Sequence, residues 1–218
     1  MLPVRFRYQT IEFDKIDIHL RTLRDRQQYF DKNDIAKNLG IPSAMWPIFG
    51  LVWPSSIVLA NFMLSYDYTN KRILEIGCGI GLTSLLLNNK FADISATDIH
   101  PEAGEFLIAN TNLNNGKVIP FERAGWNDLD TELGQFDLVI GSDLLYEKES
   151  INNLACFIDN HTRIESNVVI IDPGRGNHAA FSKKMATLGY SHNQEKTGNT
   201  NYLEKPYSGQ ILQYQRQQ

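Results

Sequence analysis

The sequence predicts a doubly wound α/β fold, in which helices cover both faces of a mostly parallel sheet. From residue 71 onward, short apolar runs alternate with segments whose apolar residues follow helical spacing. These strands are short apolar runs, as parallel strands buried on both faces tend to be. A chain of 218 residues can bury one good core. We therefore expect a β-hairpin-like extension over residues 1–45 and one α/β domain over residues 46–218.

The N-terminal part should contain strands and then a helix. Residues 4–23 alternate in places between polar and apolar side chains, as in IEFDKIDIHLRTL, which favours a hairpin-like pair of strands. The segment FDKNDIAKNLGIPSA follows and is expected to be a linker. Pro54 then opens the segment PSSIVLANFMLSY, in which helical spacing predicts a helix from about residue 55 to 66.

The remaining elements follow the alternating pattern. Strands are expected at RILEI, ADISATD, FDLVIGS and NVVIID, with GKVIPFE leading into a loop, and helices over residues 80–89, 101–113, 147–160 and 177–188. The last segments, YSHNQEK and SGQILQYQ, are expected to form an antiparallel pair at the sheet edge.

Composition narrows the class of protein. The net charge is −4, from 21 basic and 25 acidic side chains, and the sequence has no dense Lys/Arg cluster, which argues against nucleic acid binding. Cys78 and Cys156 lie far apart, so neither a disulfide framework nor a zinc site is expected. The N-terminus lacks the apolar region of a signal peptide, and the most apolar stretch is too broken for a comfortable membrane span. We expect a cytoplasmic protein.

A glycine-rich loop follows the first strand of the α/β domain, in ILEIGCGIG. In doubly wound sheets ligands bind at the carboxyl ends of the strands, and Gly77 and Gly79 would allow a tight turn and close approach of a ligand. A dinucleotide fingerprint would require glycine at position 82, which is Leu. Glu75 would repel a pyrophosphate and suit a cationic ligand.

The second strand ends at Asp98, about 20 residues beyond the glycine loop, where a carboxylate can accept both hydroxyls of a ribose. The alternative is a capping role, because Pro101 is suited to the first turn of the next helix. Together with Glu75, the loop and Asp98 describe a site for a nucleoside with a charged, phosphate-free arm, and S-adenosylmethionine fits that description. Ile99 and Ser142, at the ends of neighbouring strands, are expected to line the same cofactor site.

From residue 45 onward the chain resembles the class I seven-β-strand methyltransferases, which implies a seven-stranded Rossmann-like sheet and S-adenosylmethionine as cofactor. After the fourth strand the chain carries GSDLLY. Amide and adenine N-methyltransferases usually carry an Asn-Pro-Pro-Tyr type sequence at this place, and this chain lacks it. The D-x-x-Y pattern of Asp143 and Tyr146 resembles the protein-lysine methyltransferases that act on calmodulin, valosin-containing protein and electron transfer flavoprotein. The tryptophan segments LVWPSS and AGWND also resemble that family, although Asn127 stands where the family often has glycine.

The resemblance implies roles for four of these side chains. Asp143 would orient the acceptor amine and accept its proton, and Tyr146 would contact the incoming cation. A nearby carboxylate also stabilises the ammonium form, which opposes methylation. The alternatives are that Asp143 caps helix 147–160 and that Tyr146 only packs. Trp53 would contact the methionine arm and Trp126 would stack on adenine, but both could simply belong to the core.

Other candidates are weaker. Cys78 is interpreted as a small residue that fits the loop, and no histidine shows metal-ligand spacing, so no metal is expected. Arg175, in DPGRGN, either binds a substrate carboxylate or lies exposed in a turn.

Three functions are compatible with these features. The first is an S-adenosylmethionine-dependent N-methyltransferase that acts on a lysine side chain of a partner protein, with an open groove over Asp143. The second is a small-molecule N-methyltransferase of the same fold, in which the N-terminal segment closes as a lid. The third is a non-catalytic cofactor-binding module, against which the complete set of Glu75, Asp98, Asp143 and Tyr146 argues.

Overall fold

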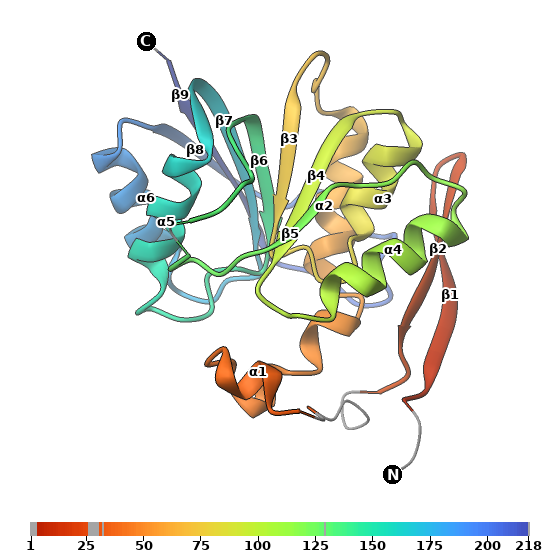
Figure 1. Ribbon diagram of the computed structural model, residues 1–218. Helices are drawn as coiled ribbons and strands as arrows, with labels where there is room; N and C mark the ends of the chain where they lie inside the picture. Colours follow the sequence, from red (N-terminus) through yellow and green to blue (C-terminus); the bar gives the residue numbers. More distant parts are fainter. Residues whose placement is uncertain (1–3, 26–30, 32, 129, 218) are drawn as a thin grey trace.

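A seven-stranded sheet forms the centre of the computed structural model, which describes residues 4–25, 31, 33–128 and 130–217 (Figure 1). The strand order is β5-β4-β3-β6-β7-β9-β8, and all pairs from β5 to β7 are parallel. The strands are β3 (Arg72–Ile76), β4 (Asp93–Asp98), β5 (Phe121–Arg123), β6 (Phe136–Ser142), β7 (Thr162–Asp172), β8 (Ser191–Lys196) and β9 (Gln210–Arg216). The predicted doubly wound, mostly parallel sheet is confirmed, as is the antiparallel pair at its edge.

Helices cover both faces of the sheet (Figure 1). The helices are α2 (Pro54–Ser65), α3 (Leu82–Asn89) and α4 (Ala103–Leu113) on one face, and α5 (Ile151–Asn160) and α6 (His178–Thr187) on the other. Successive residues of β3 point to opposite faces, so that Ile73 joins the first buried cluster and Leu74 the second. This two-sided burial explains why the central strands β3 and β6 are mostly apolar.

Several element boundaries differ from the sequence prediction. Helix α5 begins at Ile151 and not at residue 147, because residues 147–150 form a turn and Ser150 is the N-cap. The alternative that Asp143 caps this helix is therefore wrong. Strand β7 begins at Thr162, before the segment NVVIID, and β5 has only three residues.

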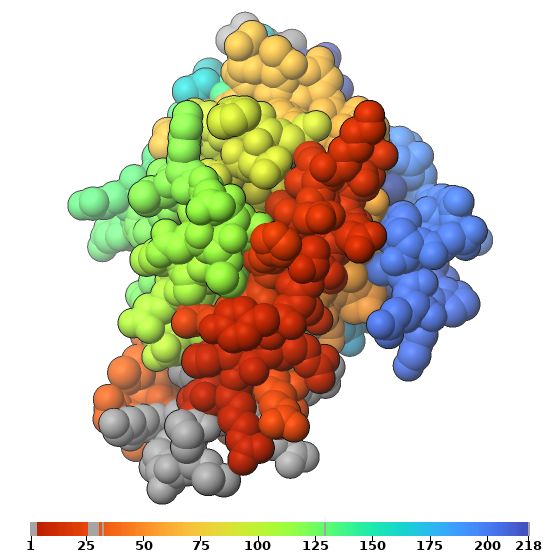
Figure 2. Space-filling model, turned by 90° about the vertical axis from the view of Figure 1, so that its right-hand side faces the viewer, coloured from red at the N-terminus to blue at the C-terminus, as the bar shows by residue number. Residues whose placement is uncertain are grey.

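The N-terminal strand pair is confirmed and lies against the α2–α4 face. Strands β1 (Phe6–Phe13) and β2 (Ile16–Leu23) are antiparallel, and the side chains that β2 buries join the first core cluster. Figure 2 shows the hairpin, in red, lying across the face that carries α3 and α4. Asn114, the C-cap of α4, pairs with the backbone of His19, accepting from its N–H at 2.8 Å and donating to its carbonyl at 2.7 Å. The Asn114 amide thus makes the two hydrogen bonds to β2 that a neighbouring strand would make. The domain boundary at residue 45 stays a prediction.

A segment of short turns connects the hairpin to the sheet. It contains α1 (Ile35–Asn38) and two 3-10 turns, η2 (Ser43–Met45) and η3 (Ile48–Gly50). Residues 43–65 are long and apolar enough to cross a membrane by length and composition alone. They are, however, divided between η2, η3 and α2, and α2 buries Val58, Leu59 and Met63 in the core. This stretch is therefore interpreted as part of the core.

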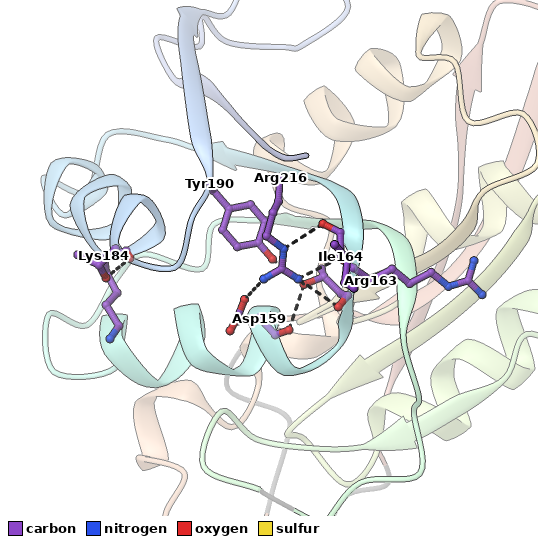
Figure 3. A network of polar contacts seen from close by, with 8 residues as sticks. Asp159, Arg163, Ile164, Lys184, Tyr190 and Arg216 are labelled. Atoms are coloured by element: carbon purple, nitrogen blue, oxygen red, sulfur yellow. Dashed lines mark hydrogen bonds and ion pairs between the residues drawn. The ribbon is translucent and has the colours of Figure 1, made fainter. Parts of the chain in front are cut away.

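The last strand is fixed by a polar network around Arg216 (Figure 3). Its guanidinium pairs with Asp159 of α5, donates to the carbonyls of residues 162–164, and lies 4.7 Å from the centre of the Tyr190 ring. The network joins β9, β7 and α5 at the end of the sheet opposite the glycine loop.

Candidate active site

A cavity of about 620 Å³ lies at the carboxyl ends of the parallel strands. Strand β4 lies on one side of β3 and β6 on the other, so the strand order reverses at this point, where ligands of doubly wound sheets bind. Its wall combines the glycine loop, the ends of β4 and β6, and the segment before α2, including Leu39, Ile41, Met45, Phe49, Gly77, Gly79, Asp98, Trp126, Asp143 and Arg175.

The glycine loop is closely packed against two other parts of the wall. Gly77 and Gly79 have φ values of +59° and +54°, which side chains with a β-carbon rarely adopt. A β-carbon on Gly79 would lie 2.9 Å from the carbonyl oxygen of Phe49. One on Gly77 would lie 2.5 Å from a methyl group of Leu144. The loop therefore requires glycine at both positions, and both glycines line the cavity.

Asp98 is held rigidly at the end of β4. One carboxylate oxygen accepts the N–H of Gly79 and the other the N–H of His100, both at 2.8 Å. Burial raises the pKa of this carboxyl. Asp98 lines the cavity, and the N-cap of the next helix is Glu102, so capping of α4 does not explain it.

Glu75 lies behind the glycine loop and is not part of the cavity wall. Its carboxylate accepts hydrogen bonds from the backbone N–H of Ser84, at 2.8 Å, and from the Ser84 hydroxyl. Burial raises its pKa to about 7. In this structure Glu75 joins the loop to the first turn of α3, and its predicted contact with a cationic ligand stays a prediction.

The other predicted cofactor residues lie on the cavity wall: Trp53, Ile99, Trp126 and Ser142. The indole of Trp53 donates to the carbonyl of Ile48 at 2.9 Å, which ties α2 to η3. The Trp126 ring packs edge-on against Phe157, with ring centres 5.2 Å apart. Both tryptophans thus belong partly to the core and partly to the cavity, and their individual cofactor contacts stay predictions.

Asp143 follows β6 in a left-handed conformation, with a φ of +56°. Aspartate tolerates this region better than most residues do, and such strain is often concentrated at functional sites. The Asp143 N–H donates to the carbonyl of Ile171 at 2.8 Å, which fixes it to the end of β7. Tyr146 lies on the same loop and is 39% exposed, and partial burial raises its pKa. The structure therefore brings the two predicted catalytic residues to the cavity that contains the glycine loop and Asp98.

Arg175 lies exposed in the loop, as one of its two sequence alternatives had it, and it also pairs with Asp143. Its Nε donates to one oxygen of the Asp143 carboxylate and its Nη2 to the other, each at 2.8 Å. This pairing raises the pKa of the guanidinium. The glycines on both sides of Arg175 have positive φ values. Two glycines that flank one residue were the available sequence signal for a tight loop.

The segment before α2 also contributes to the cavity. Residues 39–42, from the predicted linker, line it, and so do Met45, Ile48, Phe49 and Leu51, which follow the linker. The Phe49 ring stacks on His100 with ring centres 3.7 Å apart. The concentration of apolar side chains just before α2 was the available signal.

The model of the lysine methyltransferase family matches residues 44–187. The chain belongs to this family. The chain is 30% identical over 140 residues to the electron transfer flavoprotein beta subunit lysine methyltransferase of Mus musculus, covering 62% of this chain and 54% of the relative. It is 32% identical over 154 residues to a histidine protein methyltransferase 1 homolog of Dictyostelium discoideum, covering 66% and 46%. The matches thus span about half the length of these relatives.

Solved methyltransferase structures confirm the fold of this chain. A methyltransferase from Pyrococcus furiosus has a TM-score of 0.60 at 19% identity, covering 74% of this chain and 82% of that one. Magnesium protoporphyrin IX methyltransferase from Synechocystis PCC 6803, solved with bound SAM, has a TM-score of 0.58 at 21% identity, covering 75% and 78%.

Family membership implies S-adenosylmethionine as cofactor, and the cavity fits it. Gly77 and Gly79 of the loop line the cavity, and the buried Asp98 lines the same space. Gly77, Gly79 and Asp98 are the residues that would hold the cofactor, with Trp53, Ile99, Trp126 and Ser142 around it.

Proposed function

We propose that this chain is an S-adenosylmethionine-dependent N-methyltransferase that methylates a lysine side chain of a partner protein. The observation that carries the proposal is the position of Asp143, whose carboxylate lines the same cavity as the glycine loop and Asp98. One cavity thus combines the residues suited to the cofactor with a carboxylate suited to an amine.

The proposed reaction is an in-line displacement. The lone pair of the acceptor nitrogen attacks the sulfonium methyl carbon, so a C–N bond forms, the C–S bond breaks, and S-adenosylhomocysteine and one proton are released. A free lysine has a pKa of about 10.4, so only about one in a thousand is neutral near pH 7. The acceptor site must therefore orient the amine and favour its neutral form.

The residues of this chain divide these tasks. Asp143 is positioned to accept a hydrogen bond from the amine, which orients the nitrogen lone pair, and to receive the proton that leaves. Tyr146 offers an aromatic face and a hydroxyl at the mouth of the cavity. The strained backbone of Asp143, bonded to Ile171, holds its carboxylate in place.

A protein acceptor is favoured over a small molecule by the exposure of the acceptor side. Tyr146 is 39% exposed and the Arg175 side chain 46%, so both lie within reach of a side chain that enters from a docked protein. The segment over residues 39–51 lines another part of the cavity. This cover supports the small-molecule alternative, but less directly than the exposed side chains support a protein acceptor. Relatives are named for lysine, histidine or arginine acceptors. We propose lysine because the family model that matches is that of the lysine methyltransferases.

The test is methyl transfer from radiolabelled S-adenosylmethionine, with wild type and Asp143→Asn in parallel. The acceptors are a cell extract and, separately, a purified electron transfer flavoprotein beta subunit, because relatives are named for that substrate. We expect a labelled protein band with wild type only, in which mass spectrometry locates a methyl-lysine. Label confined to small molecules would replace the proposal by its alternative. Absence of S-adenosylhomocysteine binding by calorimetry would contradict the function altogether.

A further inference from the structure

The Asp143 carboxylate, which the proposed function assigns to the acceptor amine, already has a cationic partner. Arg175 donates to both of its oxygens with a parallel pair of hydrogen bonds at 2.8 Å. Among the described residues, no other side chain is hydrogen-bonded to this carboxylate or to the Arg175 guanidinium. The two side chains also line the cavity together. An amine that reaches Asp143 therefore meets an ion pair and not an isolated carboxylate.

The fold builds this pairing through the loop between β7 and α6. The side chain of Asn177 donates to the carbonyl of Leu145 at 2.9 Å, which joins this loop to the loop that carries Asp143. The Arg175 N–H donates to the carboxylate of Asp172 at 3.4 Å. Gly174 and Gly176 take positive φ values of +93° and +85° on either side of Arg175. The guanidinium is thus directed to Asp143 by the loop itself.

The electrostatic consequence concerns the protonation state of the acceptor. An isolated Asp143 would favour the ammonium form, which has no lone pair for attack. A guanidinium in contact with that carboxylate offsets its charge and repels a second cation a few ångströms away. The carboxylate oxygens keep lone pairs that the guanidinium does not use, so they can still accept a hydrogen bond from an amine.

We propose that Arg175 is a positioning residue of the acceptor site, which holds the Asp143 carboxylate and opposes an ammonium there, so that a neutral amine is favoured. This inference rests on the proposed methyltransferase function and deepens it. It assigns to the DPGRGN loop the task of removing the preference for a charged acceptor that Asp143 alone would create.

Other titratable groups also face this pair from the elements around it. They are Tyr146 and Glu147 on the same loop, Asp98 of β4, Asp172 of β7, His178 of α6, and Tyr207 before β9. Burial raises the pKa of both tyrosines and of the Asp172 carboxyl. Because all of these groups remain when Arg175 alone is replaced, a substitution there isolates the effect of the guanidinium.

The test uses two cofactor analogues and needs no acceptor protein. Sinefungin carries a primary amine on the carbon that replaces the sulfonium sulfur, so it places an amine where the transferred methyl group would lie. S-adenosylhomocysteine lacks that amine. The affinities of both are measured by calorimetry for wild type, Arg175→Gln, Arg175→Lys and the control Arg163→Gln. Arg163 forms a similar exposed pair with Asp137, at 2.7 Å, and does not line the cavity.

We expect Arg175→Gln to bind sinefungin about tenfold more tightly relative to S-adenosylhomocysteine than wild type does, because one repelling charge is gone. Arg175→Lys, which keeps the charge, and Arg163→Gln should stay near the wild-type ratio. An unchanged or lower ratio in Arg175→Gln would overturn the inference while leaving the proposed function intact. Failure of wild type to bind S-adenosylhomocysteine would overturn both.

The pH dependence supplies a readout that a merely structural role would not alter. If the bound amine is disfavoured as an ammonium, sinefungin affinity should rise more steeply between about pH 7 and 9 in wild type than in Arg175→Gln, relative to S-adenosylhomocysteine. Equal slopes in the two proteins would count against the inference, because a loop that only supports the fold would weaken both ligands at every pH.

Discussion

Two arginine–aspartate pairs in this protein have similar chemistry and very different surroundings. Arg216 of β9 and Asp159 of α5 lie beside the start of β7. There the Arg216 guanidinium also donates to three backbone carbonyls and lies over the Tyr190 ring (Figure 3). Arg175 and Asp143 lie at the opposite end, and the Arg175 side chain is 46% exposed, against 20% for Arg216. The first guanidinium has many partners and the second depends on one carboxylate.

The difference teaches how to separate a structural ion pair from a functional one. Replacing Arg216 would leave carbonyls and a carboxylate without their donor in a partly buried place, which is costly. Replacing Arg175 would leave a single carboxylate, which is 16% exposed against 28% for Asp159 but which lines the cavity, where ligands can reach it. We therefore expect the Arg216 pair to determine stability and the Arg175 pair to determine chemistry.

The largest expected effect is on catalysis, and it compares the two aspartates. Asp143→Asn should lower kcat for methyl transfer by about a thousandfold, because the amide cannot accept the proton. Asparagine is the right replacement since it tolerates the positive φ at this position. Asp159→Asn is the matched control and should leave kcat within about twofold of wild type. Equal losses in both variants would show that the comparison is wrong.

The next largest effect is on stability, and it compares the two arginines. Arg216→Ala should lower the free energy of unfolding by about 3 kcal/mol, because it leaves Asp159 without its cation in a partly buried site. For a chain of this size, the midpoint of thermal unfolding should fall by roughly 10 °C. Denaturant titration of Arg216→Ala checks this, with Arg163→Ala, which removes an exposed ion pair, as the control. A loss of less than about 1 kcal/mol would mean that the network adds little.

How much of this could be predicted from the sequence depends on the range of the signal. The apolar run RILEI, the glycines at 77 and 79 and Asp98 are local patterns, and they predicted the sheet and the cofactor side of the cavity. Strand alternation likewise predicted the hairpin. In each case the residues that determine the structure are close together along the chain.

Contacts between distant segments could not be predicted in the same way. The pairing of Arg175 with Asp143 joins residues 32 positions apart, and both sequence alternatives for Arg175 missed it. The contact between Phe49 and the glycine loop likewise depends on how the segment before α2 folds back. Glu75 differs again: its position two residues before Gly77 was clear, but only packing shows that it bonds to Ser84 and not to the cavity.

A third prediction concerns Glu75, a buried carboxyl without an arginine. Its pKa in the folded protein is about 7, above the ordinary value of 4.5. The folded state thus holds a proton that the unfolded state releases between about pH 4.5 and 7, so stability should fall as pH rises through that window. Glu75→Gln should remove this fall.

At pH 8 the cofactor-free Glu75→Gln protein should be more stable than wild type by on the order of 2 kcal/mol. Thermal unfolding at pH 5 and pH 8 measures the difference, with Glu105→Gln on the α4 surface as the control. A variant that is destabilised equally at both pH values would show that the bonds to Ser84 require the charged form.

The smallest expected effect completes the comparison of the two arginines. Arg175→Gln should change the free energy of unfolding by less than about 1 kcal/mol, because the guanidinium is 46% exposed and pairs with a carboxylate that lines the cavity, so the pair contributes little after screening. Raising the salt concentration to 0.5 M should reduce even that difference, since the screening length then falls to a few ångströms. Denaturant titrations at two salt concentrations measure both effects, with Arg163→Gln as the matched exposed pair. If Arg175→Gln instead lost about as much stability as Arg216→Ala, the DPGRGN loop would be part of the folding framework. A stable Arg175→Gln protein with altered sinefungin binding would place the role of Arg175 in the acceptor site, because the same substitution would then separate ligand recognition from folding.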